Sequence, residues 1–483
     1  MAGKSIGGLS SIKYSFRVAS KVGYGNFWKS ITSKNTCKTC AYGMGGQRGG
    51  MINESGTILE ICKKSIQAQL TDIQQPIPES VFLENSIAEL KKRSGRELEM
   101  LGRLNFPLYK GKDSNHFKKM TWEAALDLVG DKFKASPSEK TFFYSSGRSS
   151  NEAAFILQLF ARLYGTNNVN NCSFYCHQAS GVGLNSTIGS GTATIQLEDL
   201  KKADLIFVIG ANPSSNHPRF LTELMHCRRR GGKVVVVNPA KEPGLIRFAI
   251  PSDVRSMLSG GSPIASDYVQ PHIGGDIAFM KGVAKVLIKN EQWNNDFVNG
   301  HTNDFEAYRA DIEDTQWEDI VKSSGVDRKS IEHIASIYLQ SKSAVFAWSM
   351  GITHHHHGVD NVESIVNLAL LRGMVGKKSA GLLPLRGHSN VQGIGSVGVT
   401  PALKERVFQN IEKHYGIELP TLEGLDTMGC MKAAYDNKIK CAFLLGGNLF
   451  GSNPDSQFAE KSLSRIPFKV YLNTTINMGH IYG

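Results

Sequence analysis

Short, fully apolar runs alternate along the chain with longer segments in which apolar positions recur every three or four residues. The short runs have the length of buried strands, and the longer segments have the period of amphipathic helices. We expect strands at 141–145, 203–210, 233–239, 344–349, 440–447 and 468–472. We expect helices at 122–129, 151–164, 219–230, 276–289, 331–340 and 359–374, the first capped by Thr121 and the fourth by Asp276.

The segment 203–239 is the clearest unit. A buried strand is followed by a polar turn at 211–218, a helix, the pair Gly231-Gly232 and a second strand. This order implies a parallel sheet, whose ligands bind at the carboxyl ends of strands, here 212–218 and 238–239. The turn Ser146-Gly147-Arg148 also joins a strand to a helix and suits a phosphate. A plain NAD-dependent dehydrogenase needs a GxGxxG fingerprint, which the chain lacks.

Composition places the chain among ordinary globular proteins, with 41% hydrophobic and 20% charged residues. Its 483 residues exceed what one core serves, so we expect two or three domains. No apolar run is long enough to span a bilayer. The net charge of +12 comes from dispersed residues, without a zinc finger or an aromatic-basic RNA motif. We therefore expect no nucleic-acid partner, but a basic surface that suits an anionic ligand or an acidic partner.

Residues 1–34 form a basic N-terminal arm, with six Lys or Arg and no Asp or Glu. The arm has neither an apolar signal region nor a twin-arginine pair, so export is not expected; a mitochondrial-type presequence is the alternative. The eight cysteines are too sparse for a disulfide scaffold of this size. A reduced, cytoplasmic setting is therefore expected.

Three cysteines near the N-terminus form a candidate metal site. Cys37 and Cys40 have CxxC spacing, and Cys62 follows after a glycine-rich stretch. This pattern is typical of an iron–sulfur site. Zinc is the rival, but a closed zinc site needs four ligands and no histidine lies between residues 37 and 62. Incidental loop thiols are the remaining alternative.

The dipeptide Cys176-His177 is the strongest single candidate. It follows a polar stretch and precedes a run that can begin a helix. A thiol at a helix N-terminus beside an imidazolium ionises more readily, and a thiolate is a nucleophile or a soft metal ligand. The alternative is a buried structural cysteine beside a hydrogen-bonded histidine. A run of four histidines at 354–357 is interpreted as a polar turn, because one loop cannot aim four adjacent imidazoles at one metal.

Several motifs together resemble one family, the bis-molybdopterin-guanine-dinucleotide oxidoreductases, in their formate dehydrogenase alpha-like branch. They occur in family order over nearly all of residues 35–480. The matching pieces are Cys37-x-x-Cys40 with Cys62-Lys63-Lys64, Cys176-His177, Gly210-Ala-Asn-Pro213 with His217-Pro218, Trp348-Ser-Met-Gly-Ile-Thr-His354, Arg386-Gly-His-Ser-Asn-Val-Gln-Gly393 and Gly446-Gly447-Asn448.

The resemblance implies roles for individual residues. Cys176 matches the ligand of molybdenum or tungsten, His177 the residue thought to handle the proton, and Arg386 the arginine that holds the substrate carboxylate. Lys64 matches the lysine between the cluster and the nearer pterin. The segments that contact the dinucleotides contribute Gly147, Asn212, Pro213, His217, Asn238, Asp276, Gly351, Gln392, Gly447 and Asn448.

The family fold is α/β, with two Rossmann-like doubly wound domains facing each other around the cofactor and a small N-terminal iron–sulfur subdomain. Applied to this chain, it implies the arm at 1–34, the subdomain at 35–63, a first discontinuous α/β domain at 64–171 and 389–483, and a second at 172–388. The implied cofactors are two molybdopterin guanine dinucleotides per chain, Mo or W, and an iron–sulfur cluster, either 4Fe-4S or incomplete.

The implied reaction is the two-electron oxidation of formate, or of a similar small carboxylate or oxyanion, with an electron-transfer protein as partner. Two departures from the family stand out. The place of a fourth cluster cysteine falls within Gly43-Met44-Gly45, and the sequence ends at Gly483, where relatives continue into a C-terminal β-barrel. We therefore expect a fragment, a truncated gene product, or a second chain that supplies the barrel. The alternative function is a degenerate, non-catalytic relative that binds a cofactor as a redox or stress-response protein.

Overall fold

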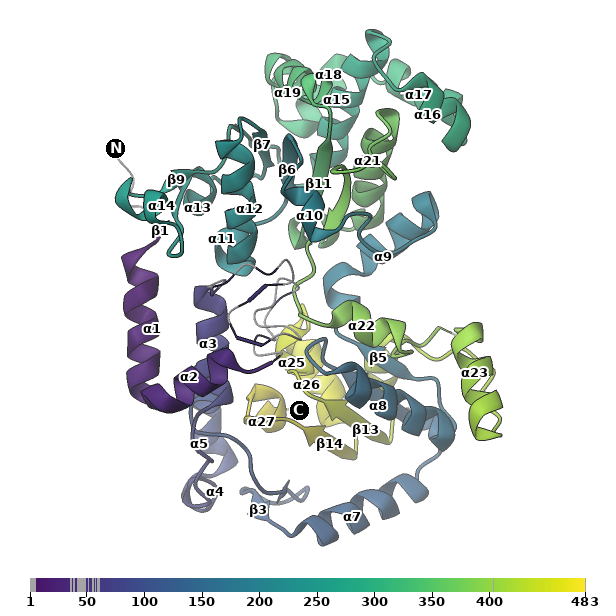
Figure 1. Cartoon of the computed structure of the whole chain (residues 1–483). Helices are drawn as coiled ribbons and strands as arrows, with labels where there is room; N and C mark the ends of the chain where they lie inside the picture. Colours follow the sequence, from purple (N-terminus) through teal and green to yellow (C-terminus); the bar gives the residue numbers. More distant parts are fainter. Residues whose placement is uncertain are drawn as a thin grey trace.

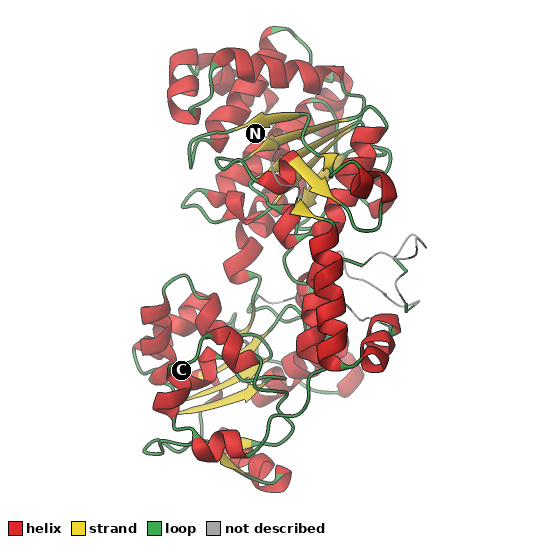
Figure 2. Cartoon of the chain, turned by 90° about the vertical axis from the view of Figure 1, so that its left-hand side faces the viewer, coloured by secondary structure: helices red, strands yellow, loops and turns green. Residues whose placement is uncertain are grey.

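The computed structural model describes residues 6–34, 37, 40, 49–50, 52–53, 56, 58, 61–402 and 404–482. Two α/β lobes lie one above the other, and N-terminal helices run along one side of both (Figures 1 and 2). The upper lobe is built around β6, β7, β10, β11 and β12, and the lower lobe around β4, β5, β13 and β14. Within the ranges just given, no helix combines the length and apolar character needed to cross a bilayer.

The upper sheet is parallel throughout, in the order β10-β7-β6-β11-β12. Its strands are Asp267–Val269, Lys233–Val237, Leu205–Ile209, Ala344–Trp348 and Gly381–Pro384. Side chains alternate between the two faces: Phe207 packs toward α15, α19 and α21, and Val208 packs toward α12. These helices span Asp276–Lys289, Arg328–Gln340, Gly358–Leu371 and Pro218–Arg229. Both faces are therefore covered, which explains why the strands are apolar throughout.

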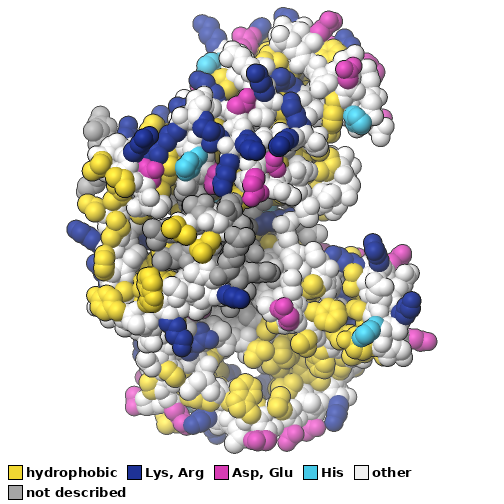
Figure 3. Space-filling view, viewed as in Figure 1, with side chains coloured by type: hydrophobic (Ala, Val, Ile, Leu, Met, Phe, Trp, Pro, Cys, Tyr) yellow, Lys and Arg dark blue, Asp and Glu magenta, His cyan; other side chains and the backbone are white. Residues whose placement is uncertain are grey.

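The lower sheet is also parallel, in the order β14-β13-β4-β5. Its strands are Phe468–Leu472, Cys441–Leu445, Thr141–Ser145 and Val169–Asn171. One face packs on α24 and α26, which span Thr427–Tyr435 and Ser456–Ser464. The other face packs on α7 and α8, Trp122–Lys134 and Asn151–Tyr164. Apolar side chains gather on the lower lobe in Figure 3, and the exposed ones on α7 and α8 are Trp122, Leu126, Ile156, Phe160 and Leu163.

The N-terminal segment is folded rather than extended. Residues 6–34 form β1 (Ile6–Gly7), α1 (Leu9–Val22) and α2 (Tyr24–Thr32). Strand β1 joins β8 (Arg247–Ala249) and β9 (Ser262–Pro263) in a small sheet. Helix α1 packs on α3 (Lys63–Asp72) through one apolar cluster. The segment predicted as a basic arm thus bridges two parts of the fold.

The remaining described elements are α9, which packs against α21, and a set of shorter or peripheral helices and strands. They are α4 Ser80–Glu84, α5 Ile87–Lys91, α6 Gly95–Glu99, β2 Leu108–Tyr109, β3 Lys118–Lys119, a 3-10 turn Ser138–Lys140, α9 Phe174–Ile188, α10 Leu197–Leu200, α11 Pro213–Asn216, α13 Pro243–Ile246, α14 Val254–Leu258, α16 Asn295–His301, α17 Phe305–Asp314, α18 Trp317–Ser324, α20 Met350–Thr353, α22 Val391–Ser396, α23 Glu405–Tyr415, α25 Leu449–Ser452 and α27 Met478–Tyr482.

The predicted α/β class with parallel sheets is confirmed, and so is the N-cap at Thr121, whose hydroxyl accepts the Ala124 N–H at 3.2 Å. The predicted cap at Asp276 is wrong by one residue. The carbonyl of Gly275 already accepts the first helical hydrogen bond, from Phe279, so Asp276 is the first residue of α15. The domain limits stay a prediction. So does the iron–sulfur subdomain, because much of 35–60, including Gly43–Gly45, lies outside the described residues.

Candidate functional site

Loops from both sheets meet where the lobes face each other. Each loop follows the carboxyl end of a parallel strand: 146–149 after β4, 172–173 after β5, which leads into α9, and 385–390 after β12. The backbone N–H of Asn390 donates to the carbonyl of Gly147 at 2.8 Å, and the Gly147 N–H donates to the sulfur of Cys172 at 3.1 Å. A Cβ at Gly147 would lie 2.8 Å from that sulfur, so the approach of the two loops requires glycine there.

Cys176 lies in the first turn of α9 and is buried. Burial raises the pKa of its thiol, although the Gly387 N–H and the Arg386 guanidinium oppose the rise. The expectation that the helix terminus makes this thiol acidic is therefore wrong. The thiol stays protonated near neutral pH until a further positive charge is placed beside it.

His177 occupies a kink in α9, with φ −134° and ψ 26°. Its Nδ1 lies 2.9 Å from the hydroxyl of Ser180, which also accepts the indole N–H of Trp348 at 2.9 Å. Its Nε2 lies 3.1 Å from the carbonyl of Leu385. The network is satisfied if Ser180 donates to Nδ1 and Nε2–H donates to Leu385. Burial, reinforced by Arg386, lowers the pKa of His177 to about 3, so the expected imidazolium is absent near neutral pH.

Arg386 is 7% exposed and lies beside Cys176. Its Nη2 donates to the Gly191 carbonyl at 2.9 Å, and its Nη1 lies 3.4 Å from the Ser173 hydroxyl and from the His177 carbonyl. Its Nε has no hydrogen-bond partner, and no carboxylate pairs with the guanidinium among the residues that the structure describes. Burial lowers the pKa of this group, although the Cys176 sulfur opposes that shift. A buried guanidinium without a counter-ion is suited to an anionic ligand.

The backbone of Arg386 is held by two histidines. His177 bonds the preceding carbonyl, of Leu385, and the Nε2 of His217 lies 2.8 Å from the Arg386 carbonyl. Burial lowers the pKa of His217 as well. Both rings therefore act as neutral hydrogen-bond partners that fix the loop carrying the arginine.

Several of the other predicted residues contact residues next to one another in the predicted binding segments, rather than each other directly. The side-chain amide of Asn238 reaches the Ala211 carbonyl at 3.4 Å, next to Asn212 and Pro213. The Gly351 N–H donates to the Gly210 carbonyl at 3.0 Å. Gly447, with φ 72°, lies against Ser146, and Asn448 accepts the Gly451 N–H at 2.9 Å.

Two further predicted residues make none of these contacts. Asp276 is buried close to His355 and His357; burial raises the pKa of its carboxyl, and the two histidines oppose the rise. Gln392 is exposed on α22.

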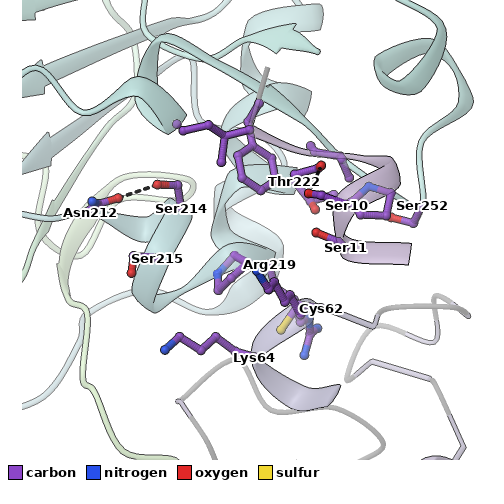
Figure 4. Close-up of a pocket in the computed structure, with 18 of the residues that line it drawn as sticks. Ser10, Ser11, Cys62, Lys64, Asn212, Ser214, Ser215, Arg219, Thr222 and Ser252 are labelled. Carbon is purple, nitrogen blue, oxygen red and sulfur yellow. Dashed lines mark hydrogen bonds between the residues drawn. The ribbon is translucent and has the colours of Figure 1, made fainter. Parts of the chain in front are cut away.

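A cavity of about 450 Å³ lies between the N-terminal segment, α3 and the turn at 212–219. It brings Cys62 and Lys64 together with Asn212 (Figure 4). Ser214 and Ser215 of its wall belong to the segment 212–218 that the sequence predicts to bind a ligand. Its wall also contains residues that sequence reasoning missed, because single polar residues at helix starts and in loops carry no recognisable pattern. These are Ser10, Ser11, Arg219, Thr222 and Ser252.

Of the predicted cluster cysteines, the structure shows Cys37 near Cys62. The Cys62 sulfur caps α3 by accepting the Ser65 N–H at 3.4 Å, and burial together with nearby Cys37 raises the pKa of its thiol. Across the described ranges, no three His, Cys, Asp or Glu side chains are arranged to hold a metal. The iron–sulfur site therefore stays a prediction.

The four histidines form the turn between α20 and α21, as the sequence favoured. His354 and His355 bond to the carbonyls of Tyr175 and Gly351 through their Nε2 atoms.

Comparison with known proteins identifies the family. The model of the molybdopterin oxidoreductase family matches residues 103–478. Protein YdeP of Escherichia coli K12 is 37% identical over 437 residues, which cover 87% of this chain and 57% of that protein. The F420-dependent formate dehydrogenase subunit alpha of Methanocaldococcus jannaschii is 32% identical over 375 residues, covering 76% of this chain and 53% of that protein.

The fold agrees with a solved structure of the same architecture. Acetylene hydratase from Pelobacter acetylenicus superposes with a TM-score of 0.63 at 16% identity, over 88% of this chain and 56% of that one. The chain spans a little more than half the length of the curated relatives that it matches. With the family model covering most of the sequence, the chain belongs to the molybdopterin oxidoreductase family.

Proposed function

We propose that the protein oxidises formate, or a similar small carboxylate or oxyanion, by two electrons at a molybdenum or tungsten centre ligated by Cys176. The observation that carries this proposal is the burial of the Cys176 thiol beside the Arg386 guanidinium, which has no acidic partner among the described residues. A relative named as a formate dehydrogenase subunit supports the choice of substrate.

The residues around Cys176 fit a metal cofactor. The thiol of Cys176 is a soft donor, and burial raises its pKa. A metal cation bound beside it would lower that pKa again and favour the thiolate. The bound cofactor would supply a soft two-electron acceptor, held by loops at the carboxyl ends of both sheets. The residues that would hold two pterin dinucleotides are Lys64, Gly147, Asn212, Pro213, His217, Asn238, Asp276, Gly351, Gln392, Gly447 and Asn448.

Within the site, Arg386 binds and orients the substrate. Its planar fork matches a carboxylate, and its burial excludes water that would weaken the contact. We assign His177 and His217 to holding this arginine in place, because each ring bonds a carbonyl of the arginine's own loop. The role in proton transfer that the resemblance gives His177 stays a prediction, and the pH experiment described below separates the two roles.

Electrons would leave toward an iron–sulfur site at Cys37, Cys40 and Cys62, past Lys64, to a partner protein. The position of Lys64 in the first turn of α3, one residue beyond the start that Cys62 caps, supports this route. The electron acceptor and a chain that completes the length seen in relatives are proposed partners.

The proposal is tested by formate-dependent reduction of a viologen dye, with protein from a host that makes the molybdenum cofactor. Cys176→Ser should lower turnover by at least ~100-fold, and Arg386→Lys should raise KM for formate by about tenfold because an ammonium cannot bind a carboxylate in two places. Cys227→Ser replaces another buried thiol, on α12, and should leave turnover unchanged. Equal turnover in the wild type and Cys176→Ser would exclude the proposed site.

A further inference from the structure

The outer side of the N-terminal helices carries large apolar side chains that the fold leaves in solvent. Leu9, Phe16, Tyr24 and Trp28 are each between 60% and 67% exposed. Leu9 and Phe16 are seven residues apart on α1, and Tyr24 and Trp28 are four apart on α2, so each pair lies on one face of its helix. Single exposed apolar residues are ordinary, but a group of them on one side of a molecule indicates a surface that binds a partner.

Positive charges lie among these apolar side chains. Lys13 and Arg17, four residues apart on α1, are exposed, and so are Lys21 near its end and Lys29 on α2. Residues 1–34 contain no Asp or Glu. Within the described part of the chain, none of the four cations pairs with a carboxylate. Their charge is therefore available to an anionic partner.

The packing of α1 holds this side outward. Val18 and Ala19, on the inner side of the helix, are buried, and Val18 belongs to one apolar cluster with Ile66 and Leu70 of α3. Strand β1, which precedes the helix, is paired with β8. Viewed from this side, α1 stands at the front of the molecule (Figure 2). A flat surface can therefore reach the helix along its length.

Helix α14 extends the same surface beside the start of α1. A Cβ at Gly8 would lie 3.5 Å from the sulfur of Met257, so the two helices are neighbours. Val254, Arg255 and Leu258 of α14 are exposed. Apolar side chains line the left edge of the molecule in Figure 3, where α1 and α14 lie in Figure 1. We call the exposed side of α1, α2 and α14 the N-terminal face.

We propose that the N-terminal face binds the surface of a membrane that contains anionic lipids. Tyrosine and tryptophan side chains favour the level of the lipid headgroups, and nearby Lys and Arg are attracted to the negative surface. Helices that lie on a membrane, without crossing it, combine these two kinds of side chain. The centre of a protein–protein interface is instead depleted of lysine, whereas Lys13 lies between Leu9 and Phe16 on this face. The proposal goes beyond the proposed function and depends on neither the cofactor nor the substrate.

The first experiment is co-sedimentation of the full chain with vesicles of phosphatidylcholine and phosphatidylglycerol in equal amounts, or of phosphatidylcholine alone. The wild type should sediment only with the anionic vesicles. Lys13→Glu with Arg17→Glu should weaken this binding by at least ~10-fold, because each cation near such a surface contributes about fivefold. Lys289→Glu with Lys322→Glu makes the same change in net charge at exposed positions of α15 and α18, and should weaken binding less than about twofold. Equal sedimentation with both kinds of vesicle, or an equal loss in the two double variants, would overturn the proposal.

The second experiment uses Trp28 to show whether the apolar side chains enter the membrane surface. Anionic vesicles should shift the tryptophan emission to shorter wavelength, and lipids with brominated chains should quench it. Trp28→Phe should remove both effects. Trp122→Phe removes a tryptophan of similar exposure on α7, outside the N-terminal face, and should keep them. A full response in Trp28→Phe would show that another surface meets the lipid, which contradicts the proposal.

Polyglutamate distinguishes a membrane from an acidic protein as the partner. Phe16→Ser leaves every charge in place, so it should weaken vesicle binding several-fold and leave any binding to polyglutamate unchanged. Binding of polyglutamate, together with vesicle binding that Phe16→Ser does not weaken, would assign the face to an acidic protein and overturn the membrane proposal. All the substituted side chains are exposed, so the variants should fold as the wild type does, measured by circular dichroism. Formate-dependent dye reduction should also be unchanged in them, so a failure here leaves the proposed function intact.

Discussion

Replacing His177 by glutamine tests whether this side chain positions the arginine loop or exchanges a proton. In the folded chain its two ring nitrogens bond Ser180 and Leu385, and its pKa is about 3. An unfolded chain titrates this histidine near pH 6.5. Between those values the unfolded state holds about one more proton, so the folded state loses stability as the pH falls below 6.5.

The magnitude follows from the two pKa values. With a pKa of about 3 in the folded state and ~6.5 in the unfolded state, His177 alone lowers the free energy of unfolding by about 2 kcal/mol between pH 7.5 and pH 5. Glutamine removes this pH-dependent part. It also leaves one of two buried polar partners unsatisfied, which costs about 1–3 kcal/mol at every pH. His388 and His480, each with a pKa of about 4, remain in both proteins and cancel in the comparison.

The assay is urea unfolding at pH 7.5 and pH 5.0, followed by far-UV circular dichroism. His177→Gln should be less stable than the wild type at pH 7.5, but should lose about 2 kcal/mol less on acidification. His414→Gln, on the exposed side of α23, is the matched control and should behave like the wild type at both pH values. If wild type and His177→Gln lose the same stability on acidification, the ring takes up a proton in the folded state. The positioning role would then be refuted and proton transfer favoured.

Three further predictions concern stability and metal content. The pKa of Asp253 is lowered to about 2, mainly by its hydrogen bonds to Arg229, so its carboxylate stabilises the fold above pH ~4 and loses this effect as the pH falls through 2. Asp253→Asn should cost about 1 kcal/mol at pH 7 and much less near pH 2, measured by chemical unfolding. Gly351→Ala would place a Cβ 2.5 Å from the Gly210 carbonyl and should destabilise by ~2–3 kcal/mol in thermal unfolding, whereas Gly395→Ala, with open space around it, should not. Cys62→Ser should abolish bound iron in the cofactor-competent host, and iron retained at the wild-type level would reject the cysteine site.

The secondary structure was largely predictable because burial leaves a strong local signal. Strands β4 and β14 and helix α8 have the predicted bounds, since a fully apolar run or a 3.6-residue period depends on residues near one another in sequence. The end of α21 was not predictable to the residue: it stops at Leu371, three positions before the predicted end. Helix ends depend on backbone hydrogen bonds, which the sequence pattern records only weakly.

The environment of the site depended on contacts that the sequence does not show. A cysteine at a helix start predicts an acidic thiol, but the pKa of Cys176 is raised because the fold buries it, and the opposing effects of Gly387 and Arg386, from the loop after β12, are smaller. The carbonyl that His177 contacts through Nε2 belongs to Leu385, which is 208 positions later in the sequence. Composition alone predicted a basic N-terminal arm. Its strand pairing with Phe248 and Ala249 could not be predicted, because two residues are too few to show a strand period. The sequence thus predicted which residue types lie at the site. Their protonation depends on burial in the fold, which the sequence does not show.

The most direct test of the account is X-ray absorption at the molybdenum or tungsten edge, on the full-length protein from a host that makes the cofactor. The account predicts close to one metal atom per chain in the wild type. It also predicts one sulfur fewer in the metal's coordination shell in Cys176→Ser than in the wild type or Cys227→Ser. Identical coordination in all three proteins would contradict the assignment of Cys176 as the ligand, and with it the proposed site.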